Sequence, residues 1–276
     1  MIASWGWRLQ RRSSNGADVR EPTAASLISL QLLTAILSLT AGSLDVITYL
    51  GLGGLFTAHI TGNLVILAAR VAGGGATGLA AMLSVPVFML MLGVTRILAG
   101  GLERAGYDSL RPLLLLQFSF LAAFLSLALV DGFKVDVATA AATIGGMLGV
   151  SAMAVQNALV QVSLKGAPGT AVMTTNLARF TMDLGTILLR ADRDTMAGAL
   201  DRANRTWPSI LGFTAGCVLG ALFEARFNLR SLALPTSLSL VALAAAMASD
   251  GERKQEHPCR HIDGGRPEGD GNASPQ

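Results

Sequence analysis

Long apolar stretches alternate with short polar connectors from Leu27 to about Ser249. The clearest stretch, Pro112–Val130, carries no charged residue and approaches the roughly 20 apolar residues that cross a hydrocarbon core. Five further stretches are similar in length and are bounded by Arg, Lys, Asp or Gly: Leu27–Tyr49, Leu79–Leu98, Val137–Val160, Pro208–Phe227 and Leu232–Ala248. The pattern predicts an all-α, polytopic transmembrane helix bundle with about six full spans.

Two apolar segments are shorter and more polar than the rest, and they leave the number of crossings open. If Phe56–Ala72 and Gly169–Leu189 both cross the membrane, there are eight spans; if both enter and return on the same side, there are six spans and two re-entrant helices. In both topologies the two chain ends share a side, and the Arg and Lys of that side predict that both termini are cytoplasmic. We therefore expect a multi-pass inner-membrane protein.

Composition supports the membrane class. Hydrophobic residues make up 51% of the chain and charged residues 14%, against roughly 25% charged in an ordinary soluble domain, and the mean hydropathy is +0.52. Residues 1–26 read as a basic cytoplasmic segment without a removable signal peptide, residues 27–249 as the transmembrane domain, and residues 250–276 as a polar tail expected to be disordered. The net charge of +3 is attributed to flanks that meet anionic membrane lipid, and no nucleic acid partner is expected.

A short internal repeat divides the membrane domain. Residues 57–64 (TAHITGNL) match residues 170–177 (TAVMTTNL) at five of eight positions, and each copy follows a long span that ends in a glycine-bearing loop. This placement predicts an internal duplication with halves of about 27–131 and 136–249. With three crossings in each half the two halves would be inverted, an arrangement that many transporters use.

The repeated segments also carry the first candidate polar site. Thr57 and Thr61 lie four positions apart, as do Thr170 and Thr174, so each pair is expected to share a helix face. Helices that begin inside a membrane leave backbone N–H groups that need protein or water around them, and the amides of Asn63 and Asn176 would line the same place. The plainer alternative is that these Thr and Asn side chains only hydrogen-bond neighbouring helices.

The first half resembles a known family. Its Gly42-Ser43-Leu44-Asp45 span end, Phe56 and the His59-Ile60-Thr61-Gly62-Asn63 run are similar to the YoaK-type family of bacterial integral membrane proteins, a domain of unknown function. Gln156-Asn157 and Pro168-Gly169-Thr170 extend the resemblance into the second half, and Thr174-Thr175-Asn176 departs from the family's usual second segment. The resemblance implies an inner-membrane location and roughly six spans, and it implies no activity or substrate.

Ionisable and amide groups inside apolar spans need an explanation, because a charge at the bilayer centre costs at least about 2.5–3.5 kcal/mol on insertion scales. Asp45 is read either as the partner of His59 in a proton-relay pair or as an interfacial acid that binds free N–H groups of the short segment. Arg179 and Asp183, four apart, are expected to neutralise each other, and Arg179 is alternatively a binding group for an anionic substrate. Gln156 and Asn157 are expected to face the bundle interior, either as structural amides or as site lining.

Several kinds of chemistry lack a sequence signature. There is no phosphate-binding Gly-x-x-x-x-Gly-Lys-Ser/Thr loop and no metal-ligand spacing in the spans, so neither a cofactor nor a metal site is expected. His257, Cys259 and His261 of the tail are read as incidental.

An intramembrane enzyme built on Ser43, Asp45 and His59 is the least favoured hypothesis. The leading hypothesis is a secondary transporter or channel for a small solute, with the polar groups around one central cavity. The alternative is a non-transporting scaffold or lipid-binding protein, and a homo-oligomer is left open.

Overall fold

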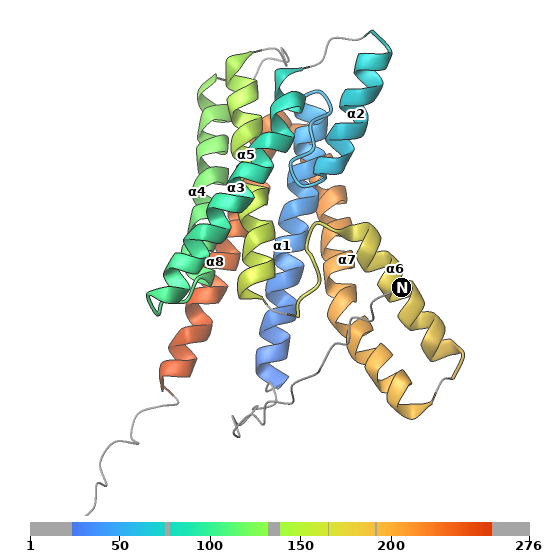
Figure 1. Cartoon of the computed structure of the whole chain (residues 1–276). Coiled ribbons are helices and arrows are strands. Elements are labelled where there is room, and N and C mark those ends of the chain that lie inside the picture. Colours follow the sequence, from blue (N-terminus) through green and yellow to red (C-terminus); the bar gives the residue numbers. More distant parts are fainter. Residues whose placement is uncertain (1–23, 75–77, 132–138, 165, 191, 256–276) are drawn as a thin grey trace, which may run out of the picture.

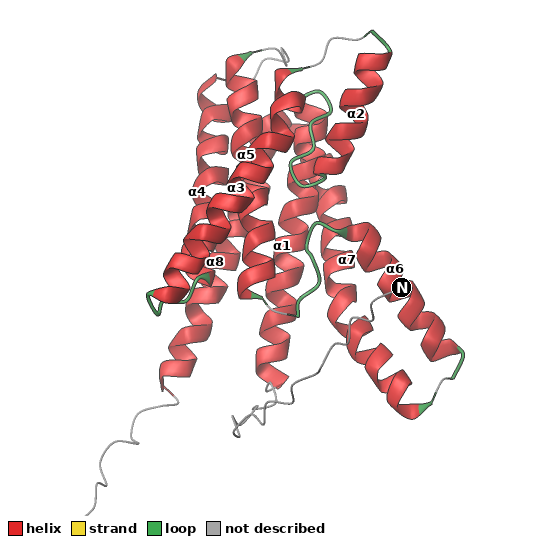
Figure 2. Ribbon diagram, viewed as in Figure 1, coloured by secondary structure: helices red, strands yellow, loops and turns green. Residues whose placement is uncertain are grey.

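The computed structural model describes residues 24–74, 78–131, 139–164, 166–190 and 192–255. Within them the chain forms eight α-helices and one short 3-10 helix, with no strand: α1 (Ala24–Gly51), α2 (Ile60–Ala72), α3 (Leu79–Arg104), α4 (Leu110–Asp131), α5 (Ala140–Ser163), α6 (Met173–Leu188), α7 (Arg193–Phe227), η1 (Asn228–Leu232) and α8 (Ala233–Gln255). The predicted all-α class is confirmed (Figure 2). Most of the predicted basic N-terminal segment, the tail from residue 256 with its two histidines and Cys259, and Lys165 lie outside the described residues.

Six of the helices are long and the other two are short. Five apolar stretches have the length and hydropathy of membrane spans, and the last of them, Arg193–Ala248, contains α7 and most of α8. The short helices α2 and α6 have 13 and 16 residues, which at 1.5 Å per residue gives lengths of only about 20 and 24 Å. A hydrocarbon core is about 30 Å thick. The protein is thus a multi-pass membrane protein by helix length and hydropathy.

The long helices run alternately up and down the bundle, and the short ones start part-way along it (Figure 1). After α1 the chain turns back into the bundle, and α2 then rises to the same end that α1 reached. After α5 the chain likewise turns back, and α6 descends to the end where α5 finished. The first ends of α2 and α6 therefore lie nearest each other, at mid-height on one side of the bundle, while the described chain begins and ends at the lower end.

One helix of each half packs against two helices of the other half. The helix α1 packs against α7 and α8, and α5 packs against α3 and α4. The helix α2 contacts α3, and α6 contacts α7, so the short helices lie outside this interlocked group. The core of large, fully buried side chains lies between the long helices and includes Phe124, Leu44, Leu121 and Met153.

The contact between α1 and α7 depends on glycine. A Cβ added at any of three glycines of α7 would overlap a backbone carbonyl oxygen of α1; the pairs are Gly212 with Ala35, Gly216 with Leu39, and Gly220 with Ser43. In return, a Cβ on Gly42 of α1 would overlap the carbonyl oxygen of Phe213. The glycine spacing of the GFTAGCVLG sequence therefore serves packing within one chain, as small residues do at close helix contacts in membranes.

The helix α7 begins well before the predicted span at Pro208. Its start is fixed by Asp192, whose carboxylate accepts hydrogen bonds from the hydroxyl (3.0 Å) and the backbone N–H (3.1 Å) of Thr195, an N-cap arrangement. These hydrogen bonds hold the pKa of Asp192 below its ordinary value. Further along, Pro208 has no N–H to give to the carbonyl of Asn204, and Gln31 of α1 donates to that carbonyl at 3.1 Å instead.

The turn between α7 and α8 is held by a buried acid. Glu224, near the end of the predicted span Pro208–Phe227, is 7% exposed. Its carboxylate accepts a hydrogen bond of 2.5 Å from the Ser231 hydroxyl of η1, and so it ties the turn to the end of α7. Arg226, two positions later, is exposed. The hydroxyl of Ser231 keeps the acid inside the protein because it supplies the polar partner that a buried carboxylate needs.

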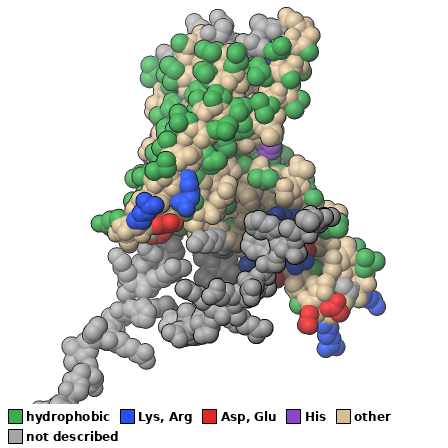
Figure 3. All heavy atoms as spheres, viewed as in Figure 1, with side chains coloured by type: hydrophobic (Ala, Val, Ile, Leu, Met, Phe, Trp, Pro, Cys, Tyr) green, Lys and Arg blue, Asp and Glu red, His purple; other side chains and the backbone are tan. Residues whose placement is uncertain are grey.

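The outer surface matches a lipid solvent. Large apolar side chains such as Val130, Ile97 and Met89 are among the most exposed groups of the long helices. On the face drawn in Figure 3, hydrophobic side chains cover the bundle, and the charged ones gather at its lower end. Exposed apolar area of this extent is unusual for a soluble monomer and is expected where hydrocarbon replaces water.

We predict that Gly216→Leu destabilises the bundle, because its side chain would force α1 away from α7. Overpacking of this kind typically costs about 1–3 kcal/mol, and the thermal unfolding midpoint in detergent measures the loss. Gly93→Leu is the matched control in another long helix, since a Cβ at Gly93 has no atom within 4 Å. Equal unfolding midpoints for the two variants would contradict the role of the α1–α7 contact.

Candidate functional site

The first break in the helical structure follows α1. Gly53 and Gly54 have φ values of 67° and 94°, in the left-handed region that glycine enters without strain. The N–H of Gly54 donates to the carbonyl of Tyr49 at 2.8 Å, which ends the helix. Residues 55–59 then run back along the bundle in non-helical conformation until α2 begins at Ile60.

Asp45 holds this returning segment in place. Its carboxylate is 2% exposed, and one of its oxygens accepts hydrogen bonds from the backbone N–H groups of Thr57 (2.7 Å) and Ala58 (2.6 Å) and from the Thr57 hydroxyl (3.0 Å). The other oxygen lies 2.5 Å from Nδ1 of His59. The two expected roles of Asp45, partner of His59 and acceptor for the N–H groups of the short segment, are thus combined in one carboxylate.

Asn63, in the first turn of α2, forms hydrogen bonds with the backbone of Phe56 in the returning segment. Its Oδ1 accepts a hydrogen bond from the Phe56 N–H at 2.9 Å, and its Nδ2 donates to the Phe56 carbonyl at 2.7 Å. Asn63 is 1% exposed. Both backbone polar groups of Phe56 are therefore satisfied without water, as a buried non-helical segment requires.

Aromatic rings surround the imidazole of His59. The rings of Tyr49 and Phe56 stack with centroids 4.8 Å apart, Phe56 lies 5.9 Å from the imidazole, and Phe213 of α7 meets the imidazole edge-on at 5.4 Å. The His59 side chain nevertheless remains 36% exposed. It is the part of this cluster that can exchange a proton with its surroundings, whereas Asp45 is enclosed.

The second break follows α5 and is held in a related way. Gly166 has a φ of 87°, and α6 begins at Met173. The Asn176 Nδ2 donates to the carbonyl of Gly169 at 2.7 Å and approaches the Ser209 hydroxyl of α7 at 3.4 Å. Asn63 and Asn176 thus both bond the carbonyl of the residue seven positions earlier.

A chain of amides supports the second break from the bundle interior. The Gln156 Nε2 donates to the Thr170 hydroxyl (2.8 Å) and to the Leu37 carbonyl of α1 (2.9 Å), and its Oε1 accepts from Gln117 Nε2 at 2.7 Å. Gln117 and Gln156 are both fully buried. Thr170 therefore has a side-chain partner in α5, as Thr57 has one in α1.

The structure corrects the placement of several predicted residues. Thr57 and Thr170 precede α2 and α6 and lie in the returning segments, so they do not share helix faces with Thr61 and Thr174. Thr61 and Thr174 are exposed on the outside of the short helices. Asn157 donates to the Met153 carbonyl of its own helix at 2.9 Å, and it belongs to neither cluster.

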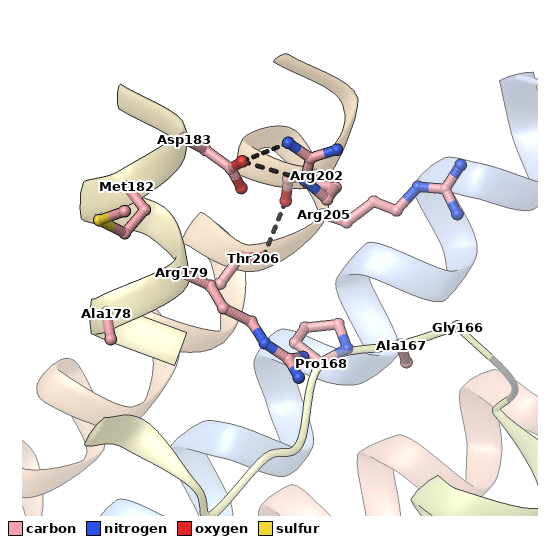
Figure 4. Close-up of a pocket in the computed structure, with 10 residues that line it drawn as sticks. All are labelled: Gly166, Ala167, Pro168, Ala178, Arg179, Met182, Asp183, Arg202, Arg205 and Thr206. Atoms are coloured by element: carbon pink, nitrogen blue, oxygen red, sulfur yellow. Dashed lines mark hydrogen bonds and ion pairs between the residues drawn. The ribbon is translucent and has the colours of Figure 1, made fainter. Parts of the chain in front are cut away.

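The expected Arg179–Asp183 pair is not formed. The Asp183 carboxylate, 6% exposed, instead accepts hydrogen bonds from Arg202 of α7, at 3.0 Å from Nε and 2.6 Å from Nη2. The Arg179 side chain extends toward Pro168 and away from Asp183 (Figure 4). A neighbouring helix supplied a better-placed guanidinium than the one four residues away on α6.

The predicted polar residues therefore gather in three places. Asp45, Thr57, His59 and Asn63 form the first-break cluster; Gln156, Thr170 and Asn176 form the second-break cluster; Arg179 and Asp183 lie in the pocket of Figure 4. These residues were expected to surround one central cavity. They instead form two clusters, one at each break, and part of a separate charged pocket.

Three partners in these clusters and in the pocket were not predicted from the sequence: Gln117, Ser209 and Arg202. Gln117 could have been found, because it is the lone amide in the apolar span Pro112–Val130. Ser209 and Arg202 carry no comparable signal, since only the contact of α7 with α6 and with the second break brings them there.

We predict that Asn63→Ala destabilises the folded protein by about 1–3 kcal/mol or more, because it leaves the buried N–H and C=O of Phe56 without partners. Thermal unfolding in detergent measures this loss. Thr61→Ala is the matched control two positions away: its side chain is exposed, so its effect should stay within about 0.5 kcal/mol. An unfolding midpoint for Asn63→Ala as high as that of Thr61→Ala would count against the support role.

Comparison with known proteins agrees with the sequence resemblance and adds no activity. Residues 33–245 match the model of a family described as protein of unknown function (DUF1275). No curated protein and no solved structure matches the chain. The match extends from α1 to α8 and covers well over half of the sequence. The chain therefore belongs to DUF1275, the YoaK-like family of multi-span membrane proteins of unknown function.

Proposed function

We propose that this protein is a secondary transporter or channel for a small solute in the bacterial inner membrane, built from two related halves. The observation that carries the proposal is the pair of short helices that begin part-way through the bundle, approached by buried, non-helical segments (Figure 1). Non-helical backbone at membrane depth is tolerated only where protein or a water-filled path surrounds it. Transporters commonly place substrate sites at such helix starts.

The internal duplication is supported by one constant offset. The starts of α2 and α6, Ile60 and Met173, are 113 positions apart. Thr57 is separated from Thr170 by the same offset, and so is Asn63 from Asn176. Each matched pair makes matched contacts: the threonines bond a polar side chain of the preceding long helix, and the asparagines bond a carbonyl seven residues earlier.

The packing of the long helices supports the same duplication. In chain order α5 corresponds to α1, α7 to α3 and α8 to α4. Exchanging the halves converts the α1–α7 and α1–α8 contacts into the α5–α3 and α5–α4 contacts, all of which are present. Because α1 rises and α5 descends in Figure 1, the proposed repeats are inverted relative to each other. An inverted pair can present its site alternately to the two sides.

In the proposed topology α2 and α6 are re-entrant, the six long helices cross the membrane, and both chain ends are cytoplasmic. The short lengths of α2 and α6 support re-entry. The common end at which the described chain begins and ends is also where charged side chains gather in Figure 3, and an excess of Arg and Lys favours the cytoplasmic side.

Within this mechanism the first-break cluster is the group that can respond to a proton. The Asp45 carboxylate holds the start of α2 through Thr57, Ala58 and His59, and the partly exposed imidazole connects the carboxylate to its surroundings. A change in protonation of the Asp45–His59 pair would change the strength of the hydrogen bonds that hold the returning segment. The cluster can thereby couple a proton to movement of α2.

A second candidate function is a non-transporting membrane scaffold or lipid-binding protein, alone or as a homo-oligomer. The observation that favours it is that Asp45 and Asn63 already have partners within the chain. On this hypothesis the clusters only stabilise the breaks, and flux is unaffected by variants that keep the fold. Membrane lipid is then the expected partner.

Neither candidate function is enzymatic. Ser43, the nominal nucleophile, donates its hydroxyl hydrogen bond to the Thr40 carbonyl of its own helix, and its backbone lies against Gly220 of α7. The Nδ1 of His59 is committed to Asp45. Nucleophilic catalysis would require the serine hydroxyl to bond its base, and these contacts direct the two residues to different partners.

The topology predicts the labelling of single cysteines in a variant that lacks Cys217 and Cys259. Cysteines at Gly75 and Lys134 should react with an impermeant reagent from outside the cell, and a cysteine at Lys165 only from inside, because α2 and α6 return to the side from which they entered. The opposite pattern at all three positions would establish eight crossings and remove the re-entrant helices.

The transport mechanism predicts that Asp45→Asn lowers flux in proteoliposomes tested with a panel of small solutes and with a proton gradient. Asparagine keeps an oxygen for the Thr57 and Ala58 N–H groups but removes the charge that faces His59. We expect a decrease of about tenfold or more, equivalent to a barrier raised by about 1.4 kcal/mol.

Ser119→Ala is the control for the flux measurement, since Ser119 is exposed and bonds only its own helix among the described contacts. Its flux should equal that of the wild type. If Asp45→Asn and Asn63→Ala both carry the flux of the wild type per folded molecule, or if no solute or proton moves at all, the transporter proposal fails and the scaffold hypothesis is preferred.

A further inference from the structure

A charged pocket at the lower end of the bundle is separate from the two break clusters. It has a volume of about 520 Å³, is open on one side, and is lined by α6, α7 and residues 166–168. Figure 4 shows three arginine side chains around it, Arg179, Arg202 and Arg205, with Asp183 at one edge. Met182 and Pro168 add apolar surface to its lining.

The positive charge of the pocket is only partly neutralised within the described part of the chain. Asp183 binds Arg202, and Asp201 binds Arg205, whose Nε and Nη2 lie 3.1 and 2.9 Å from its carboxylate. Arg179 forms no ion pair or hydrogen bond with any described residue, and its guanidinium points into the pocket near Pro168. Three arginines therefore face two carboxylates, which leaves one guanidinium without an anion.

The position of the pocket along α7 places it at the edge of the apolar bundle. Charged residues are frequent from Arg193 to Arg205, and none follows until Glu224. The half-exposed Trp207 lies two positions after the last of them, and tryptophan is enriched at membrane–water interfaces. The guanidinium of Arg179 thus lies near the level of lipid headgroups and remains accessible from water.

We propose that this pocket binds an anion through a phosphate group, with Arg179 as the main ligand and Arg202 and Arg205 as supporting charges. A guanidinium presents a planar set of donors that matches two phosphate oxygens. The ion pairs with Asp183 and Asp201 hold the other two arginines in place and leave Arg179 for the ligand. The phosphate can belong to an anionic lipid headgroup or to a small phosphorylated solute, and both present the same chemistry.

The test is calorimetric titration of the full-length protein in detergent, with inorganic phosphate and with dihexanoyl phosphatidylglycerol below its micelle concentration. Dihexanoyl phosphatidylcholine, which has no net charge, serves as the comparison lipid. For whichever phosphate probe binds the wild type, Arg179→Gln should weaken binding at least about tenfold, equivalent to about 1.4 kcal/mol. Binding of phosphatidylglycerol alone would identify a lipid headgroup, and binding of phosphate alone a small solute.

Arg193→Gln is the matched control, because it removes the same charge from the exposed start of α7 without touching the pocket. Its affinity should stay within about twofold of the wild type, a change of less than about 0.5 kcal/mol. The proposal is wrong if neither phosphate probe binds, if Arg179→Gln binds as the wild type does, or if Arg193→Gln weakens binding equally. Because binding is measured at equilibrium, these outcomes are independent of any flux.

Discussion

The need to satisfy backbone polar groups without water governs this structure. Where α1 and α5 end, the chain turns back among apolar helices before α2 and α6 begin. Each returning segment exposes N–H and C=O groups that hydrocarbon cannot bind, at a cost of several kcal/mol per group. Asp45, Asn63 and Asn176 supply partners for these backbone groups, and the positions of both short helices depend on them.

The same constraint explains why the long helices pack so closely. The returning segments need a firm surface to bind, and α1 provides it for both: Asp45 holds the first, and the Leu37 carbonyl binds Gln156, which in turn holds Thr170 of the second. The glycines of α7 bring its backbone against α1, which also sets Ser209 beside Ser38 (2.8 Å) and Asn176. The close contact of α1 with α7 therefore also positions the polar side chains that hold the returning segments.

The pocket around Arg179 depends on the charged residues of α6 and of the lower part of α7. The lower part of α7 is polar and has its own cap at Asp192, so it extends beyond the apolar bundle and carries Arg202 and Arg205 to the side of α6. Asp183 is buried by this contact and takes its charge partner from α7. Arg179 is left facing the pocket because the buried acid is paired with Arg202.

Hydropathy and length alone identified the six long helices and the two short ones, because apolar runs of membrane length and their polar connectors are a local property of the chain. The repeated Thr and Asn positions also indicated the two breaks, and the contact of Asp45 with His59, one of the two alternatives that the sequence left open for Asp45, is present. Neighbours far apart in the sequence could not be predicted in this way. The pairing of Asp183 with Arg202, the burial of Glu224 under Ser231 and the amide chain from Gln117 to Thr170 were decided only when the helices packed. The physical reason is that a polar group in an apolar interior bonds whichever partner the packing brings within about 3 Å, and one sequence does not state which helices will be adjacent.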